Sequence, residues 1–225
     1  MATKTQYFNP IAKANTDAPA KPAPAKKSKA APRSARSGPT TKEKIERAAL
    51  SLFAASGVDG VSTKDLAATA GVSEGVIYRY FISKTELARS LMVAGHKRLA
   101  DLVRAAEQAP GRLPEKVSAI VAGYCDFADE DSDAFYYYVL HFHGFKDLAV
   151  DAGDSPMRAA TDIIRHAQSR GEIPGGDPAV KAAMALGCVT QTATAKLYGQ
   201  IPGALGDNAA AFNAAVMAVL LSDAR

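Results

Sequence analysis

Three helix-start signals follow one another between residues 40 and 87, and their spacing limits the fold more than any other feature of the sequence. Each signal is a Ser or Thr followed three residues later by an acid, a pattern in which the two side chains cap a helix N-terminus. The starts lie only 22 and 21 residues apart, which leaves room for short helices in quick succession. The pairs are Thr40 with Glu43, Ser62 with Asp65, and Ser83 with Glu86.

Hydrophobic spacing predicts helices along the rest of the chain as well. The first helix repeats apolar residues on one face, ending at Leu52 and Phe53, and Gly57 is its expected stop. Runs rich in Val, Ile and Thr with the alternation of strands are missing. We therefore expect an all-α fold of about nine helices. The later helices are expected over about 84–108, from Pro114, near Asp133, near Pro156, from Asp177-Pro178 to about Tyr198, and from Asp207 to about Leu221.

Composition excludes several classes of protein. Two cysteines, Cys125 and Cys188, cannot make a disulfide framework, and no Cys-x-x-Cys spacing exists for zinc or redox chemistry. No apolar run reaches the roughly 18 residues that a membrane span needs, and the N-terminus lacks the apolar core of a secretory signal. We expect a cytoplasmic protein with no membrane partner, no metal and no other cofactor.

The formal net charge of +4 conceals an uneven distribution. Residues 1–39 carry +7, residues 40–104 carry +3, and residues 105–225 carry −6. Such asymmetry indicates contact with nucleic acid or a membrane at the basic end. Residues 1–39 are rich in Ala, Pro, Lys and Ser, so we expect a disordered tail. Two roles stay open for it: a solubilising leader, or a polycation that adds non-specific attraction to phosphates.

Residues 62–81, STKDLAATAGVSEGVIYRYF, have the layout of a helix-turn-helix. Gly71 supplies a left-handed turn without steric cost, Val72 is expected to fill the corner, and Ser73 is expected to cap the second helix. Ile77 and Phe81 are expected to seat the second helix on Leu52 and Phe53. The opposite face of that helix is then available for a DNA major groove, which is roughly 12 Å wide.

The ordered pattern Leu-Ala-x-x-Ala-Gly-Val-Ser-x-Gly-x-Ile-Tyr-x-Tyr-Phe-x-x-Lys-x-x-Leu, residues 66–87, resembles the DNA-binding signature of the tetracycline-repressor (TetR) family. The resemblance covers residues 41–87. It implies a homodimeric all-α transcription regulator, usually a repressor that a small-molecule effector releases from its palindromic double-stranded DNA operator. The implied domains are a basic tail (1–39), a three-helix helix-turn-helix DNA-binding domain (40–87), and a helical ligand-binding and dimerisation domain (88–225).

The resemblance also assigns DNA contacts by position. Three residues are expected to reach phosphates, and six to lie on or beside the recognition helix. The first group is Thr63, Lys64 and Lys84; the second is Ser73, Gly75, Val76, Tyr78, Arg79 and Tyr80. Glu74 is an unexpected acid beside an anionic backbone. It can accept from a cytosine amine or favour the helix N-terminus through the macrodipole, and we favour the second.

Half of the sixteen aromatic residues lie within residues 124–145. Three consecutive tyrosines, Tyr136 to Tyr138, span about 200° of a helix, so they cannot all face one core. Some are expected to face a cavity, a partner or solvent. We expect a pocket for a flat or apolar ligand, with ordinary core and interface packing as the alternative. Its expected lining is Tyr124, Phe127, Tyr138, His141 and Phe142.

The sequence offers no catalytic or metal-binding set. His141 and His143 are two residues apart and point about 200° away from each other on a helix, so they cannot chelate one ion. The acids between Asp129 and Asp133 are expected to form a solvated loop and a helix cap. We therefore expect no enzyme. Two rivals remain: a helical enzyme with an appended helix-turn-helix, and a ligand-binding or interaction module that has lost DNA binding.

The last two helices carry small and apolar residues suited to close packing. They are expected to pair with their two-fold mates in a four-helix dimer interface, or else to pack within one subunit. The threonines at 190, 192 and 194 are an alternative lining for the pocket. The packing residues are Ala182, Ala183, Ala185, Leu186, Val189, Ala209 to Phe212, Ala215, Val216, Val219 and Leu220.

Overall fold

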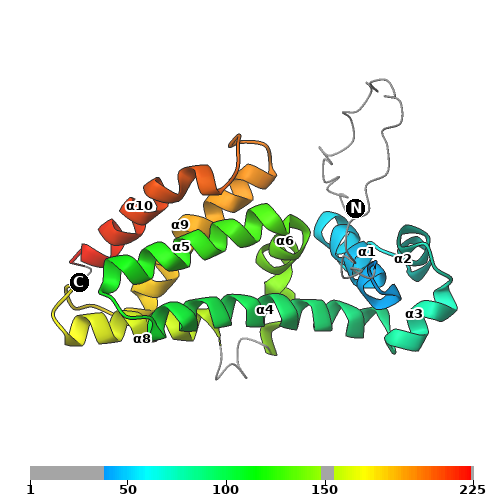
Figure 1. The fold of residues 1–225 in the computed structure, drawn as a ribbon, viewed down its shortest axis with the longest axis horizontal. Helices are drawn as coiled ribbons and strands as arrows, with labels where there is room; N and C mark the ends of the chain where they lie inside the picture. Colours follow the sequence, from blue (N-terminus) through cyan, green and yellow to red (C-terminus); the bar gives the residue numbers. More distant parts are fainter. Residues whose placement is uncertain (1–37, 148–154, 224–225) are drawn as a thin grey trace, which may run out of the picture.

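The computed structural model describes residues 38–147 and 155–223, and within them every regular element is a helix. Nine α-helices and two short 3₁₀ helices make up this part of the chain, which confirms the all-α fold (Figure 1). The expected basic tail lies outside the described residues. The α-helices are α1 (Thr41–Ser56), α2 (Thr63–Ala70), α3 (Glu74–Tyr80), α4 (Lys84–Gln108), α5 (Leu113–Glu130), α6 (Ser132–His141), α8 (Pro156–Ser169), α9 (Pro178–Leu197) and α10 (Ala209–Leu221), and the 3₁₀ helices are η1 (Phe142–Gly144) and η2 (Gly206–Asn208).

The capping signals hold α1 and α2 as the sequence predicts. The Thr40 and Ser62 side chains each accept from the backbone N–H three residues on, and the acids Glu43 and Asp65 accept from the cap N–H groups in return. The hydrogen bond from the Thr40 backbone N–H is the largest cause that lowers the pKa of Glu43, and the hydrogen bond with the Thr40 side chain is the next. Each cap satisfies N–H groups that a helix start otherwise leaves unpaired.

The caps of α3 and α4 differ from the prediction. Ser73 is the N-cap of α3 as expected, but its side chain makes no capping hydrogen bond. Ser83 accepts from the Glu86 N–H as expected, at 3.0 Å. The Glu86 carboxylate, however, accepts from the N–H of Ile82 at 2.6 Å and so holds the turn that precedes the helix.

The first four helices enclose a continuous apolar core. Phe53, Leu66, Ile77 and Phe81 are all buried there, and Leu52 packs against them from a half-buried position. Ile77 of α3 and its C-cap residue Phe81 therefore share one core with Leu52 and Phe53 of α1, as the expected seating of the second helix requires. The core extends along α4 as far as Met92. It thus continues past residue 87 into the helix that links the two halves of the molecule.

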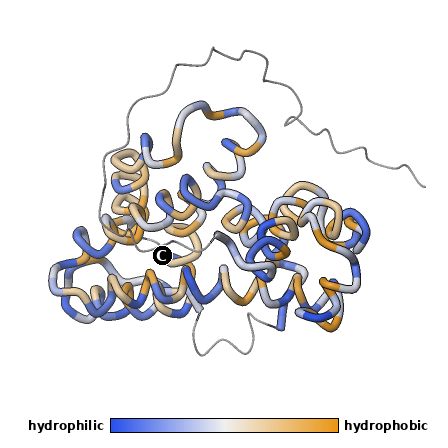
Figure 2. Tube along the Cα trace, turned by 45° about the vertical axis from the view of Figure 1, so that its right-hand side comes forward, coloured by the Kyte–Doolittle hydropathy of each residue, from blue (hydrophilic) through white to orange (hydrophobic). Residues whose placement is uncertain are grey.

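Helix α4 is the spine of the molecule (Figure 1). It runs from the end of α3 along one side of the remaining helices, and α1, α5, α6 and α8 all pack on it. Hydrophobic and hydrophilic residues alternate along this helix, as an amphipathic helix requires (Figure 2). Gly123 of α5 lies against Leu102 of α4, where an added Cβ would meet Leu102 Cδ1 at 2.2 Å. Glycine therefore allows the two helices to approach closely.

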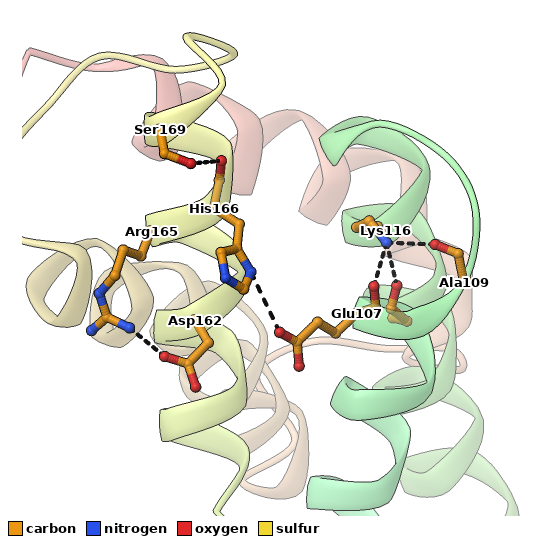
Figure 3. A network of polar contacts seen from close by, with 8 residues as sticks. Glu107, Ala109, Lys116, Asp162, Arg165, His166 and Ser169 are labelled. Atoms are coloured by element: carbon orange, nitrogen blue, oxygen red, sulfur yellow. Dashed lines mark hydrogen bonds and ion pairs between the residues drawn. The ribbon is translucent and has the colours of Figure 1, made fainter.

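A half-circle of backbone carbonyls at the end of α4 binds a buried lysine (Figure 3). Lys116 of α5 donates from Nζ to the carbonyls of Ala106, Glu107 and Ala109 at 2.9, 2.6 and 2.6 Å. These are carbonyls that a helix C-terminus leaves unpaired, at its negative end. The Glu107 side chain faces His166 of α8 at 3.6 Å. Lys116 thus ties the start of α5 to the end of α4.

Helices α5, α8, α9 and α10 surround the second apolar core. Lys181, only 1% exposed, donates to the carbonyls of Leu220 and Ser222, both at 2.8 Å, and so fastens the end of α10 to the start of α9. Asp129 accepts from the N–H groups of Leu205 and Gly206, both at 2.8 Å. The acidic run therefore includes one structural anchor as well as exposed acids.

Candidate DNA-binding surface and ligand cavity

Helix α3 presents one face to the core and the other to solvent. Ile77 is buried, whereas Ser73, Gly75, Arg79, Tyr78 and Tyr80 are exposed. The tyrosines are large side chains with 54% and 45% of their surface exposed. Tyrosine hydroxyls and an arginine fork on an exposed helix are the groups that reach phosphates and base edges.

Two glycines shape the approach to this face for different reasons. Gly71 has φ +68° and ψ +36°, a left-handed conformation that glycine adopts without cost and that turns the chain between α2 and α3. Gly75 lies in the first turn of α3, where an added Cβ would have no neighbour within 4 Å. Nothing in the described fold requires glycine at this position. Because Gly75 has no side chain, this part of α3 leaves room for an external partner.

The remaining predicted contacts lie at the edges of this surface. Lys64 is exposed at the start of α2, and Thr63 is half-buried with its hydroxyl 3.5 Å from the Tyr78 hydroxyl. Val76 is half-buried and packs partly on the core. Ile82, which the motif did not single out, has 86% of its surface exposed just beyond α3. Its exposure follows from its place in the turn that Glu86 holds.

Lys84 differs from the expectation. Its Nζ donates to the carbonyls of Val58 and Val61, both at 2.6 Å, in the loop between α1 and α2. The side chain is half-buried. Because the ammonium is already held by two carbonyls inside the domain, the structure supports a packing role for Lys84 in place of the expected phosphate contact.

A cavity of about 570 Å³ lies in the second half of the molecule. We call it the wide lobe; α4, α5, α6, η1, α8 and α9 all contribute to its wall. A volume of this size is typical of pockets for small molecules. Three of the five predicted lining residues are there, Tyr124, Tyr138 and Phe142. The other lining residues are His96, Ser155, Pro156, Met157, Arg158, Leu186 and Thr190.

An ordered set of rings forms one wall of the wide lobe. The His96 and Phe142 rings stack with centroids 5.2 Å apart and planes within 6°. His96 Nδ1 lies 3.1 Å from the Tyr138 hydroxyl. Burial raises the pKa of both Tyr124 and Tyr138, so both phenols stay neutral at physiological pH. The wall therefore combines flat apolar surfaces with neutral polar groups.

A second, narrow lobe of about 50 Å³ adjoins the wide one. Tyr124 and Leu186 line both lobes, and the rest of the narrow lobe is aliphatic. It lies among α5, α8, α9 and α10. Its other lining residues are Leu113, Val117, Ile120, Val121, Ala160, Ile163, Ile164, Ala185, Val189, Val216 and Leu220.

Two predicted pocket residues lie elsewhere. Phe127 is 1% exposed in the second core, where its ring covers the Arg98 guanidinium at 3.8 Å and meets Phe135 edge-on. His141 faces α1 instead of the cavity, with its ring near Gly57 and 5.6 Å from the Tyr137 ring. Burial lowers the pKa of His141, although a hydrogen bond with the Ala54 backbone opposes the shift. Helix packing turns both side chains away from the wide lobe.

Helix α6 connects the cavity to the helix-turn-helix half. Tyr137 is fully buried in the first core, 5.8 Å from the Phe53 ring, and its hydroxyl donates to the Ala88 carbonyl at 3.0 Å. Its neighbour Tyr138 lines the wide lobe, and Tyr136 packs on Phe135 in the second core. The three tyrosines thus occupy three environments, as their angular spread predicts.

The outer faces of α9 and α10 are apolar but not covered by other described residues. Val180, Met184 and Leu221 are 50%, 46% and 52% exposed, and the exposed face of α10 is built largely of alanine. Part of the predicted packing set faces inward instead, since Ala182, Val189, Phe212, Val216 and Leu220 are buried within the subunit. Thr190 lines the wide lobe, and the hydroxyls of Thr190, Thr192 and Thr194 each donate to the carbonyl four residues back.

The described residues hold neither a candidate metal site nor a candidate membrane span. Over 38–147 and 155–223, no three His, Cys, Asp or Glu side chains gather in a way that could hold a metal ion. In the same part of the chain, no helix combines the length and apolarity needed to cross a membrane.

The chain is similar to several known regulators. Residues 45–91 match the family described as bacterial regulatory proteins, tetR family. The HTH-type transcriptional regulator SrpR of Pseudomonas putida is 26% identical over 140 residues, 60% of this chain and 64% of that protein. The nucleoid occlusion factor SlmA of Actinobacillus pleuropneumoniae is 31% identical over 91 residues, 40% of this chain and 45% of that protein. The chain thus aligns with less than two thirds of the length of either relative.

Solved structures agree over a larger part of the fold. The fatty acid degradation regulator FadR from Bacillus halodurans superposes with a TM-score of 0.68 at 19% identity, covering 85% of this chain and 99% of that one. Identity at this level establishes the shared fold alone. The match at the helix-turn-helix and the agreement of the fold lead to one conclusion: the chain carries the helix-turn-helix of the TetR family of transcriptional regulators.

Proposed function

We propose that this protein is a DNA-binding transcription regulator, acting as a homodimeric repressor that a small molecule releases from a palindromic operator. The exposed face of α3 is the observation that carries the proposal. Arg79, Tyr78 and Tyr80 extend from a short helix whose inner face is fixed by Ile77 in a filled core. A rigidly seated helix with exposed fork and hydroxyl groups fits the major groove.

The wide lobe is the proposed effector site. Helix α6 contributes Tyr138 to the wall of the wide lobe and Tyr137 to the core of the helix-turn-helix half. A ligand that displaces Tyr138 is therefore expected to move α6 and to disturb the packing of Tyr137 on Phe53. A ligand that prefers the conformation unable to bind DNA shifts the population toward it. This arrangement supports release by an effector.

The outer face of α9 and α10 is the proposed dimer interface. Small alanine side chains allow close helix approach, and Val180, Met184 and Leu221 supply apolar area around them. Two copies related by a two-fold axis would bury these helices as a four-helix bundle. Sedimentation of the full chain tests this: we expect a dimer, and Met184→Glu is expected to shift it toward monomer.

A fluorescence anisotropy titration of the full chain against its own upstream DNA tests DNA binding. We expect a specific complex whose affinity falls steeply with salt, since phosphate contacts release counterions. The absence of any salt-dependent specific complex would contradict the proposal. It would favour the rival ligand-binding module that has lost DNA binding.

The same titration tests whether the basic tail, residues 1–39, contributes to DNA binding. If residues 1–39 contact phosphates, their removal lowers the slope of log affinity against log salt. An unchanged slope identifies the tail as a leader without a role in DNA binding.

The rival helical enzyme is less well supported. An enzyme needs titratable groups that converge on one cavity. The only titratable side chains among the described lining residues of the wide lobe are His96, Tyr124, Tyr138 and Arg158, and burial raises the pKa of both phenols further above physiological pH. The cavity therefore fits binding better than turnover.

A further inference from the structure

The two lobes of the cavity differ in chemistry. Every residue of the narrow lobe except Tyr124 is aliphatic, so water there would find almost no hydrogen-bond partner. Small apolar voids of this kind stay dry and accept apolar groups. A narrow and elongated apolar group gains from filling the lobe, whereas a broad ring system does not fit a volume of about 50 Å³.

The wide lobe has the opposite character. Its described lining includes hydroxyls at Tyr138, Ser155 and Thr190, the imidazole of His96 and the guanidinium of Arg158. None of its described lining residues is a carboxylate. Arg158 is exposed at the edge of this lobe, on the first turn of α8. A cationic head group would meet one fixed positive charge and no described negative one, while an anionic head group would meet a complementary partner.

The junction between the lobes sets the shape of the occupant. Tyr124 and Leu186 line both lobes, so a molecule that passes between them has one end in each. We infer that the cavity takes an elongated amphipathic anion, with an unbranched apolar tail in the narrow lobe and a carboxylate near Arg158 in the wide lobe. This inference rests on the proposed role of the cavity as the effector site, and it replaces the broad expectation of a flat or apolar ligand with a stated chemical class.

Calorimetric titration of the full chain with three ten-carbon probes tests the head group. Sodium decanoate carries the anion, methyl decanoate removes the charge, and decylamine reverses it. We expect decanoate to bind most tightly and decylamine least. Arg158→Gln is expected to weaken decanoate threefold to tenfold, as for an exposed charge-assisted contact, and to leave methyl decanoate unchanged. Arg165→Gln, on the same helix but outside both lobes, is the matched control.

A series of straight-chain acids from six to twelve carbons tests the narrow lobe. Affinity is expected to rise roughly threefold to fourfold for each added methylene until the lobe is filled. Ala185→Leu fills part of the lobe from α9, and Ala160→Leu fills it from α8, so both are expected to shorten the preferred chain. Ala179→Leu, at an exposed position of α9, is the control, and melting of each variant without ligand checks that it folds.

The outcomes separate this inference from the proposed function. Decylamine binding as tightly as decanoate, affinity that ignores chain length, or no binding of any acid would overturn the inference, and anisotropy with DNA would still decide the proposed function. Acids that bind in the expected pattern, without any DNA complex, would uphold the ligand class and overturn the regulator. Acid binding that also weakens the DNA complex would support both.

Discussion

The two halves of the molecule differ in how tightly their helices pack. Around the helix-turn-helix, short helices close on a buried apolar core, and neither the wide nor the narrow lobe is lined by α1, α2 or α3. In the other half, longer helices leave two adjoining lobes, which are lined by α4, α5, α6, α8, α9 and α10. A well-packed core suits the proposed DNA-binding surface, which then keeps one shape. The half proposed to accept a ligand keeps unfilled volume and loses some packing energy as a result.

Truncating one leucine in each half tests this contrast most strongly. Leu66 is fully buried in the first core, so Leu66→Ala is expected to cost about 2–5 kcal/mol of unfolding free energy. Leu186 is half-buried and already faces a cavity, so Leu186→Ala is expected to cost less than half as much. Denaturant unfolding measures both, and equal losses would remove the distinction between the halves.

Lys84 provides the next largest effect and separates packing from DNA contact. Lys84→Met leaves the carbonyls of Val58 and Val61 without their charged donor, so we expect a loss of about 1.5–3 kcal/mol in stability. The salt slope of DNA binding should stay as in the parent chain. A stable Lys84→Met variant with a salt slope smaller by about one would instead identify Lys84 as a phosphate contact.

Arg79 is the reciprocal case, an exposed residue for which we propose a role in recognition alone. Arg79→Ala should leave the melting temperature almost unchanged and weaken binding to the operator by about 1–3 kcal/mol if the guanidinium reads a base. Anisotropy with operator and scrambled DNA measures the difference. A loss that is the same for every sequence would place Arg79 on phosphate.

His141 gives the smallest effect, at the contact between the halves. Its pKa lies below the ordinary value near 6.5 because burial disfavours the charged ring. The unfolded chain therefore binds more protons than the folded one as pH falls through that value, and stability is lost toward acid. Between pH 7.5 and 5.5 the melting temperature should fall less for His141→Gln than for the parent chain. Equal falls in the two melting temperatures would contradict this.

The sequence predicted the helices well because their ends depend on nearby residues. The bounds of α4 agree with the expected 84–108, and the caps at Thr40 and Ser62 form as the spacing requires. Ser73 failed as a side-chain cap, although it occupies the N-cap position. A capping motif specifies which residue begins a helix, while the rotamer of its hydroxyl depends on surroundings that the motif does not contain.

The cavity was harder to predict because its walls come from distant segments. Tyr124, Tyr138 and Phe142 were expected there, but Phe127 and His141 face the second core and α1. Which faces of α5 and α6 border the cavity is set by α4, α8 and α9, which lie far along the chain. Thr190, offered as an alternative lining residue, does lie there, whereas His96, Arg158 and Leu186 were not predicted to line the cavity, because only packing brings them to one wall. The contacts of α3 with DNA and of the cavity wall with a ligand stay predictions.

The two lysines at the ends of α4 have a mechanical consequence. Lys84 fixes the first residue of the helix to the α1–α2 loop, and Lys116 holds its last carbonyls. A helix held in this way at both ends resists sliding along its axis, so a rigid-body movement of it is a tilt against the helices that pack on its sides. Its 25 residues span about 37 Å. A tilt of about 5° then displaces the far end by about 3 Å, comparable to the length of one hydrogen bond.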